Sequence, residues 1–286
     1  MPIVQRTFEE AADILKIDFW AMAVVGPAEI QNQTVNTQPL MLSAGVATFR
    51  AWQEQGGDAP ALFAGHSLGE YTALVAADAL RFADALSLVR LRAQAMQDAV
   101  PEGTGGIAAV IGLDVEQVRA VCADAAEGEV LEAVNLNSPG QIVIAGHKTA
   151  VERGMALART RGAKRALMLP MSVPSHCALM KPAAEKLAIA LKSVTCNVPA
   201  TAVIQNADVR AFSSAESIKK ALVEQLYRPV RWIETIQAIV ADGSSAVIEC
   251  VPGKVLTGLN KRIDANLNCL SISDTTALVA AIGATR

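Results

Sequence analysis

The sequence lacks the features that mark several large classes of protein. Aromatic residues make up only 4% of its 286 residues, and its net charge of −3 gives no sign of nucleic-acid binding through bulk charge. The five cysteines form no Cys-x-x-Cys pair and are odd in number, so we interpret them as reduced thiols rather than disulfides or metal ligands. No glycine-rich phosphate loop is present, so nothing indicates a bound nucleotide.

Long apolar runs are missing as well. Glu9 and Glu10 stand where a secretory signal would need an apolar region. The uncharged span 30–49 is interrupted by glutamine and asparagine side chains, so it would not cross a bilayer. We therefore expect a soluble, cytoplasmic protein.

What the sequence has in quantity is aliphatic residues arranged in helical and strand-like segments. The apolar fraction is 52%, enough for a substantial core in a chain of this length. Segments 1–102 are mainly helical with one strand before Ser67. The segment 107–169 follows the order strand, helix, strand, strand, helix, strand, which matches a ferredoxin-like unit with a turn at 137–140. Helices and short strands alternate after His176.

One glycine-bounded serine has the context of a catalytic nucleophile. Ser67 stands between Gly65 and Gly69, after a strand-like segment (61–64) and before a helix-like one (71–77). A sharp strand-to-helix turn strains the serine backbone and leaves no room for side chains, so we expect glycine to be required at both flanks. The serine hydroxyl would then lie at a helix N-terminus, where backbone N–H groups stabilise an oxyanion. A serine that merely caps a helix is the alternative, and the flanking strand and helix favour the nucleophile.

A serine hydroxyl needs a base to take its proton, and the chain has only three histidines. His66 adjoins Ser67 and would point away from it, and His147 lies in a polar segment that we interpret as a solvated loop. His176 is the best base by elimination, with a packed or helix-capping histidine as the alternative. No acid has an obvious claim on His176, and a long region follows it, an order unlike that of an α/β-hydrolase. This order favours acyl transfer to a thiol over hydrolysis.

Two arginines lie on the helix predicted over 82–100. Arg90 and Arg92 flank its apolar stripe on opposite sides, and periodicity does not choose between them. An arginine that extends from the helix flank into solvent is the simpler interpretation of Arg92.

Together these motifs resemble the malonyl-CoA:acyl-carrier-protein transacylases of bacterial type II fatty-acid synthesis. The resemblance is collinear from about Pro2 to the C-terminal region. It rests on segments 65–70, the helix with Arg92, 137–141, 145–147, 173–176, 225–227, 229–230 and 252–256. The resemblance implies an α/β fold with a large α/β-hydrolase-like domain that has a parallel sheet core, over residues 1–102 and 172–286. A small ferredoxin-like domain, residues 103–171, is inserted in it.

The resemblance also implies a role for five residues. Ser67 is expected to be the nucleophile and His176 the general base and acid. Arg92 is expected to hold the malonyl carboxylate, for which a planar guanidinium has bidentate geometry. The Leu68 backbone N–H is the implied oxyanion donor, and the main-chain carbonyl of Gln225 is implied to orient the His176 ring.

The implied reaction is a ping-pong transfer through a malonyl-serine, from malonyl-CoA as substrate to the phosphopantetheine thiol of acyl carrier protein. The resemblance implies no metal and no cofactor, and we expect a monomer. Acyl carrier protein is acidic, so basic residues near the cleft are candidates for docking it, each equally well an ordinary solvated side chain. They are Lys164, Arg165, Lys254, Lys261 and Arg262.

Two departures from the family pattern qualify this interpretation. Family members open with an apolar strand and a Gly-Gln-Gly-Ser-Gln loop, whose first glutamine supplies a second oxyanion donor. This sequence opens at Met1 without a counterpart, so we expect an oxyanion hole with one donor; losing a donor costs on the order of a hundredfold in rate. Val251 stands where glycine is usual.

Three alternatives to this interpretation are open. The first is the related transacylase that serves malonate decarboxylase, which the acceptor carrier protein would distinguish. The second, which the missing glutamine loop keeps open, is an inactive, truncated homologue that only binds CoA thioesters or carrier protein. A thioesterase-like hydrolase comes last, because Arg92 and the order of Ser67 and His176 do not favour it.

Overall fold

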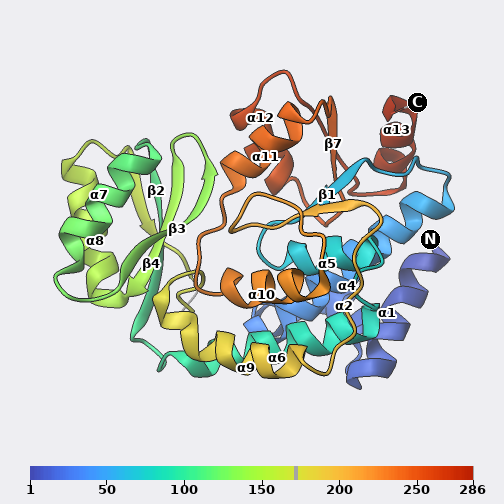
Figure 1. The fold of residues 1–286 in the computed structure, drawn as a ribbon, viewed down its shortest axis with the longest axis horizontal. Coiled ribbons are helices and arrows are strands. Elements are labelled where there is room, and N and C mark those ends of the chain that lie inside the picture. Colours follow the sequence, from blue (N-terminus) through green and yellow to red (C-terminus); the bar gives the residue numbers. More distant parts are fainter. Residues whose placement is uncertain (171–172, 286) are drawn as a thin grey trace.

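The computed structural model describes residues 1–170 and 173–285. Figure 1 shows two parts: an antiparallel sheet with two helices at one end of the molecule, and a larger group of helices around short parallel strands. In the part of the chain that the structure describes, no helix combines the length and the hydropathy needed to cross a bilayer.

The N-terminal region is helical, as predicted, with one strand. Its elements are α1 (Pro2–Leu15), α2 (Phe19–Val25), α3 (Ala28–Gln31), α4 (Thr34–Glu54), β1 (Leu62–Ala64), α5 (Gly69–Ala76) and α6 (Phe82–Ala99). The 3.6-residue period of α6 predicts an apolar stripe of Leu86, Val89, Ala93, Met96 and Val100. The first four are buried, whereas Val100 follows the end of the helix and is half-buried. Helix α6 packs against α4 and α9 (Lys181–Leu191), and Leu86, Val89 and Met96 are part of the largest hydrophobic core of the described residues.

The antiparallel part contains β2 (Gly105–Ile111), α7 (Val115–Ala126), β3 (Leu131–Ser138), β4 (Gln141–His147), α8 (Lys148–Thr160) and β5 (Arg165–Met168). The strand order β3-β4-β2-β5 is the ferredoxin-like arrangement, with α7 and α8 packed over a core of their own. The predicted turn at 137–140 is shorter than expected, because Asn137 and Ser138 belong to β3 and only Pro139 and Gly140 connect the strands. The domain boundaries stay a prediction, and residues 171–172 lie outside the described residues.

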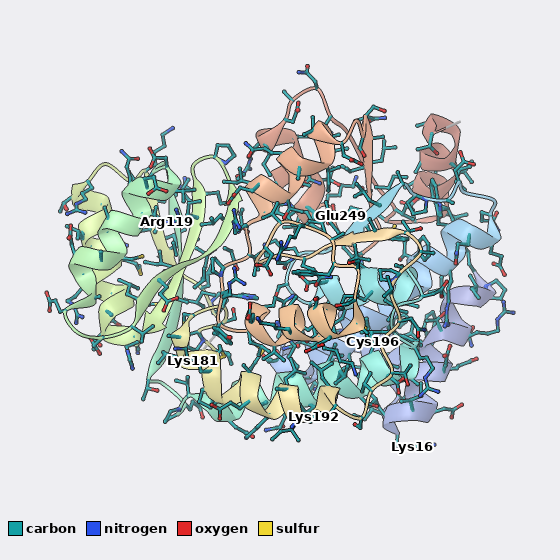
Figure 2. The ribbon with its side chains drawn as sticks, in the orientation of Figure 1. Lys16, Arg119, Lys181, Lys192, Cys196 and Glu249 are labelled. Atoms are coloured by element: carbon teal, nitrogen blue, oxygen red, sulfur yellow. The ribbon has the colours of Figure 1, made fainter. Side chains whose placement is uncertain are left out.

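The C-terminal region alternates helices with short strands. It contains a 3-10 turn (Ala178–Met180), α9, β6 (Ala202–Ile204), α10 (Ala215–Gln225), α11 (Trp232–Ala241), β7 (Ala246–Glu249), α12 (Val255–Ile263), β8 (Asn268–Ser271) and α13 (Thr275–Thr285). Glu249, labelled in Figure 2, ends β7 and accepts hydrogen bonds from the Leu256 and Thr257 N–H groups, which holds α12 against the strand. The sequence did not predict α12, β8 or α13.

The α/β class with parallel strands is confirmed. Among the described residues, the parallel strands form two separate pairs, β1 with β6 and β7 with β8, rather than one continuous sheet. The pairing of β1 with β6 positions the site, because parallel strands end at the same edge and the segments after Ala64 and Ile204 therefore lie side by side. The end of β3 reaches the same region, where the Leu136 N–H donates to the Val230 carbonyl at 2.9 Å.

Candidate active site

The turn between β1 and α5 has the backbone of a nucleophile elbow. Ser67 adopts a left-handed conformation with φ of 51°, which is uncommon for a residue other than glycine. The Gly69 N–H donates to the His66 carbonyl at 2.9 Å, and the Glu70 N–H donates to the Ser67 carbonyl at 3.1 Å, so the chain enters α5 directly. This geometry presents the serine side chain at the helix N-terminus.

The two flanking glycines have different reasons for being there. A Cβ on Gly65 would lie 2.0 Å from the Gly69 carbonyl carbon and oxygen, so no other residue fits. A Cβ on Gly69 would meet nothing within 4 Å. The expectation that sterics require glycine on both sides is therefore wrong for Gly69, because only the first flank is in contact with the returning helix.

Ser67 and His176 meet although 109 residues separate them. The Ser67 Oγ lies 2.7 Å from His176 Nε2, and His176 Nδ1 lies 2.7 Å from the Gln225 main-chain carbonyl oxygen. Because a carbonyl only accepts, Nδ1 carries the hydrogen and Nε2 is left to accept the serine proton. Burial, and then the positive charge of Arg92, lower the pKa of His176 to about 3. The imidazole is therefore neutral at physiological pH and available as a base.

Arg92 is buried beside the serine. Only 2% of Arg92 is exposed, and its Nη2 lies 3.4 Å from the Ser67 Oγ. Nη1 donates to Gln38 Oε1 at 2.6 Å and Nη2 donates to Gln225 Oε1 at 3.1 Å, which orient the guanidinium without neutralising it. The interpretation of Arg92 as a solvent-directed helix-flank residue is thus wrong. Arg90 turns instead to α4, where it donates to the Val35 carbonyl at 2.6 Å.

The Arg92 guanidinium has no ion-pair partner among the residues that the structure describes. The nearby Glu70 does not supply one, because burial raises the pKa of its carboxyl to about 8 and keeps it protonated at neutral pH. Within the described residues, Arg92 Nε, Glu70 Oε1 and Tyr71 Oη are buried without hydrogen-bond partners. A buried cation without a counter-ion is costly, so the site favours an anionic ligand next to the nucleophile.

Gln225 connects the three polar members of the site. Its main-chain oxygen accepts from His176, its side-chain oxygen accepts from Arg92, and its Nε2 donates to the Ser67 carbonyl at 2.9 Å. The family resemblance implied a role only for the main-chain oxygen. The side chain carries no local signal, since it lies at the C-terminal end of α10 and reaches the site only through the fold.

Two neighbouring backbone N–H groups at the elbow differ, because one has a hydrogen-bond acceptor and the other has none among the described residues. The Ser67 N–H donates to Asn206 Oδ1 at 2.7 Å. The Leu68 N–H, at the N-terminus of α5, has no acceptor in the described part of the chain, so it is free to bind an oxyanion. Gln38 and Asn206 were both missed as site residues. The one hint was that Gln38 is among the amide side chains that interrupt the span 30–49.

The other two histidines lie away from the Ser67 hydroxyl. His66 Nε2 is 2.8 Å from Asn137 Oδ1 on β3, and its ring lies 5.5 Å from that of Trp232. His147 is not the solvated loop residue that the sequence predicted: it ends β4, is half-buried, and its Nδ1 accepts from the Val130 N–H at 2.9 Å.

Comparison with known proteins gives this geometry a family. A model described as the acyl transferase domain matches residues 4–267. A malonyl CoA-acyl carrier protein transacylase of Escherichia coli (strain K12) is 54% identical over 281 residues, which are 98% of this chain and 91% of that protein. This chain belongs to the malonyl-CoA:acyl-carrier-protein transacylase family. The transacylase of Bacillus subtilis (strain 168) is 42% identical over 283 residues, covering 99% of this chain and 89% of that protein.

Solved structures of the transacylase family share the fold closely. One is a malonyl-transacylase in complex with a type II PKS acyl-carrier protein; it has a TM-score of 0.98 and 51% identity, over 99% of this chain and 92% of that chain. An acyl carrier protein S-malonyltransferase from Vibrio cholerae has a TM-score of 0.96 and 53% identity, over 98% and 92% of the two chains. The family resemblance inferred from the motifs is confirmed.

Proposed function

We propose that this protein transfers the malonyl group of malonyl-CoA to the phosphopantetheine thiol of acyl carrier protein. Its curated relatives bear this activity in their names, and one structural relative is bound to an acyl carrier protein. The observation that carries the substrate assignment is the buried, unneutralised Arg92 guanidinium 3.4 Å from the Ser67 hydroxyl. An acyl group whose far end is a carboxylate matches it in charge and geometry.

In the first half-reaction, the Ser67 Oγ attacks the thioester carbonyl carbon while its proton passes to His176 Nε2 across the 2.7 Å hydrogen bond. The carbonyl oxygen becomes an oxyanion, which accepts a hydrogen bond from the Leu68 N–H. The intermediate then collapses, the carbon–sulfur bond breaks, and the CoA thiolate takes the proton from His176. The product is malonyl-Ser67.

The second half-reaction reverses these roles with a different thiol. The phosphopantetheine thiol gives its proton to His176 and attacks the ester carbonyl carbon. The carbon–oxygen bond to Ser67 breaks, and the serine oxygen recovers the proton from His176. The Gln225 carbonyl holds the imidazole in one tautomer through both halves and never takes a proton itself.

Substrate binding also prepares the base. The charge of Arg92 is the second-largest cause of the lowered pKa of His176, after burial. A bound malonyl carboxylate neutralises that charge, so it raises the pKa of His176 towards the operating pH and makes the imidazole a stronger base. Malonyl-CoA is thereby favoured over acyl thioesters without a terminal carboxylate.

We propose a monomer as the active unit, since Ser67, His176, Arg92 and Gln225 meet within a single chain. We assign the reaction to the cytoplasm, since free cysteines fit a reducing compartment. Among the proposed docking residues, Lys261 and Arg262 lie in the last turn of α12 and are exposed.

Intact-mass measurement after incubation with malonyl-CoA or acetyl-CoA tests the proposal. We expect a malonyl adduct on the wild-type protein and none on Ser67→Ala. Arg92→Ala should lower malonyl loading relative to acetyl loading by about 10–150-fold, the worth of a hydrogen bond to a charged group. Arg90→Ala is the matched control, because Arg90 lies on the same helix and bonds to α4 instead.

Two results would contradict the proposal: folded wild-type protein that gains no adduct, or an adduct that survives in Ser67→Ala. Chasing the adduct with holo-acyl carrier protein, and separately with the carrier protein of malonate decarboxylase, identifies the acceptor. Loss of the adduct to water alone would indicate the hydrolase.

A further inference from the structure

Asn206 lies beside the nucleophile elbow although it is far from it in sequence. It follows β6 by two residues, as the elbow follows β1, and the parallel pairing of Ala64 with Ile204 brings the two segments to the same edge. Asn206 is fully buried, with 0% of its surface exposed. A buried amide side chain at this position needs hydrogen-bond partners, and it finds them in the elbow.

The Asn206 side chain holds two peptide groups of the elbow at once. Its Oδ1 accepts from the Ser67 N–H at 2.7 Å, and its Nδ2 donates to the Gly65 carbonyl at 2.6 Å. These two bonds bracket His66 and set the direction of the chain where Ser67 enters its left-handed conformation. Such a conformation costs energy in a residue with a side chain, and it persists only where the surroundings enforce it.

Asn206 is itself held in place by its main chain. Its N–H donates to Glu70 Oε2 at 2.7 Å, and its carbonyl accepts from the Arg231 N–H at 3.2 Å. Glu70 is also fully buried and stands on the first turn of α5, directly after the elbow. Through Glu70, helix α5 therefore fixes Asn206, and Asn206 in turn fixes the backbone on either side of His66 that leads to Ser67.

We propose that Asn206, oriented by Glu70, is a positioning residue that locks the elbow so that the Ser67 hydroxyl meets His176 and the Leu68 N–H stays free for the oxyanion. This inference rests on the proposed function for the meaning of the site. It assigns Asn206 no contact with substrate. Because Oδ1 occupies the Ser67 N–H, that amide is not an oxyanion donor.

Asn206→Ala tests this role through the rate of acyl loading. A misplacement of about 1 Å costs on the order of a hundredfold, so kcat for loading should fall by about that factor. The KM for malonyl-CoA should change less than about threefold, because Arg92 is held by Gln38 and Gln225 instead. Malonyl and acetyl loading should fall by the same factor, whereas a substitution of Arg92 would lower malonyl loading more than acetyl loading.

Gln205→Ala is the matched control. Gln205 is the neighbouring residue, is 1% exposed, and its side-chain amide has no hydrogen-bond partner among the described residues. Truncating it removes a similar buried volume without breaking a bond to the elbow. Loading by this variant should stay within about threefold of wild type.

Asn206→Asp distinguishes a role in positioning Ser67 from a role in the stability of the fold. It is also the test variant to use if Asn206→Ala does not fold. When protonated, the new carboxyl can still accept from the Ser67 N–H and donate to the Gly65 carbonyl. When ionised, it opposes the Gly65 carbonyl, to which it can no longer donate. Its loading rate relative to wild type should therefore rise as pH falls from about 8 to about 6, while a merely structural loss would leave that ratio constant.

The rate at which a fluorophosphonate probe labels Ser67 keeps the two proposals distinguishable. If wild type is labelled but does not load malonyl, the proposed function fails while the labelling ratio still reports on Asn206. Equal labelling of wild type and Asn206→Ala, or a pH-independent ratio for Asn206→Asp, would overturn the positioning role. No labelling of folded wild type would overturn both, because no poised nucleophile would exist.

Discussion

Replacing Gln225 by glutamate should change which acyl group the protein accepts. The Gln225 side-chain oxygen lies 3.1 Å from Arg92 Nη2, and the two side chains are 1% and 2% exposed. Gln225→Glu keeps the main-chain carbonyl that orients His176, and it keeps the size of the side chain. It adds a carboxylate where the guanidinium now has no counter-ion.

The size of the effect follows from charge. In the variant, Arg92 is already neutralised, and an incoming malonyl carboxylate meets a like charge. For a separation of about 5 Å and an effective dielectric constant of about 20, that repulsion is about 3 kcal/mol. This corresponds to a loss on the order of a hundredfold in kcat/KM for malonyl-CoA, whereas acetyl-CoA carries no such charge and should lose much less.

The assay is loading kinetics with malonyl-CoA and acetyl-CoA, expressed as the ratio of the two kcat/KM values. Gln225→Met is the control, because it removes the bonds to Arg92 and to the Ser67 carbonyl without adding charge. Comparing the glutamate and methionine variants isolates the electrostatic part. The same malonyl-to-acetyl ratio in both would refute the argument that an unneutralised Arg92 selects the substrate.

Three further outcomes are expected. Because burial raises the pKa of Glu70 from 4.5 to about 8, the folded chain holds a proton that the unfolded chain loses, so the free energy of unfolding should fall as pH rises across that range. In urea melts, Glu70→Gln should show a smaller fall than wild type, and the same pH dependence in both would contradict this. Gly65→Ala should abolish loading and lower the melting temperature, because its Cβ would lie 2.0 Å from the Gly69 carbonyl, while Gly69→Ala should be tolerated. With the pKa of His176 at about 3, through burial and then Arg92, acetyl loading should show no acid limb down to about pH 5; a wild-type acid limb near pH 6.5 would count against it.

Local pattern was sufficient for much of the fold. Helix α7 forms where the ferredoxin-like order places its first helix, and α9 and α11 are among the helices expected after His176. The ferredoxin-like order followed from alternating helix and strand periods. The separation of the parallel strands into two pairs did not, since strands of three or four residues carry no information about their neighbours.

The site is likewise divided between features that local sequence predicts and features that only the fold brings together. The elbow around Ser67 is a local structure, so its glycines and flanking elements predicted it. His176 emerged by elimination from only three histidines. Gln38, Gln225 and Asn206, whose side chains orient the reacting groups, come from three distant segments. Gln38 and Asn206 belong to none of the motifs that carry the family resemblance, and the motif at 225–227 pointed only to the main-chain carbonyl of Gln225. Residue type alone does not separate a buried, bonded amide from one on the surface.

The sequence by itself determined the nucleophile turn, its helix and the family, because these depend on neighbouring residues and on motif spacing. Helical periodicity left Arg90 and Arg92 open, and the family resemblance chose Arg92. The tertiary structure gives the physical reason, since packing buries Arg92 beside the serine and turns Arg90 to α4. It also decided that Glu70 stays neutral and leaves the guanidinium without a counter-ion. Burial sets both outcomes, and burial is a property of the assembled fold rather than of any segment.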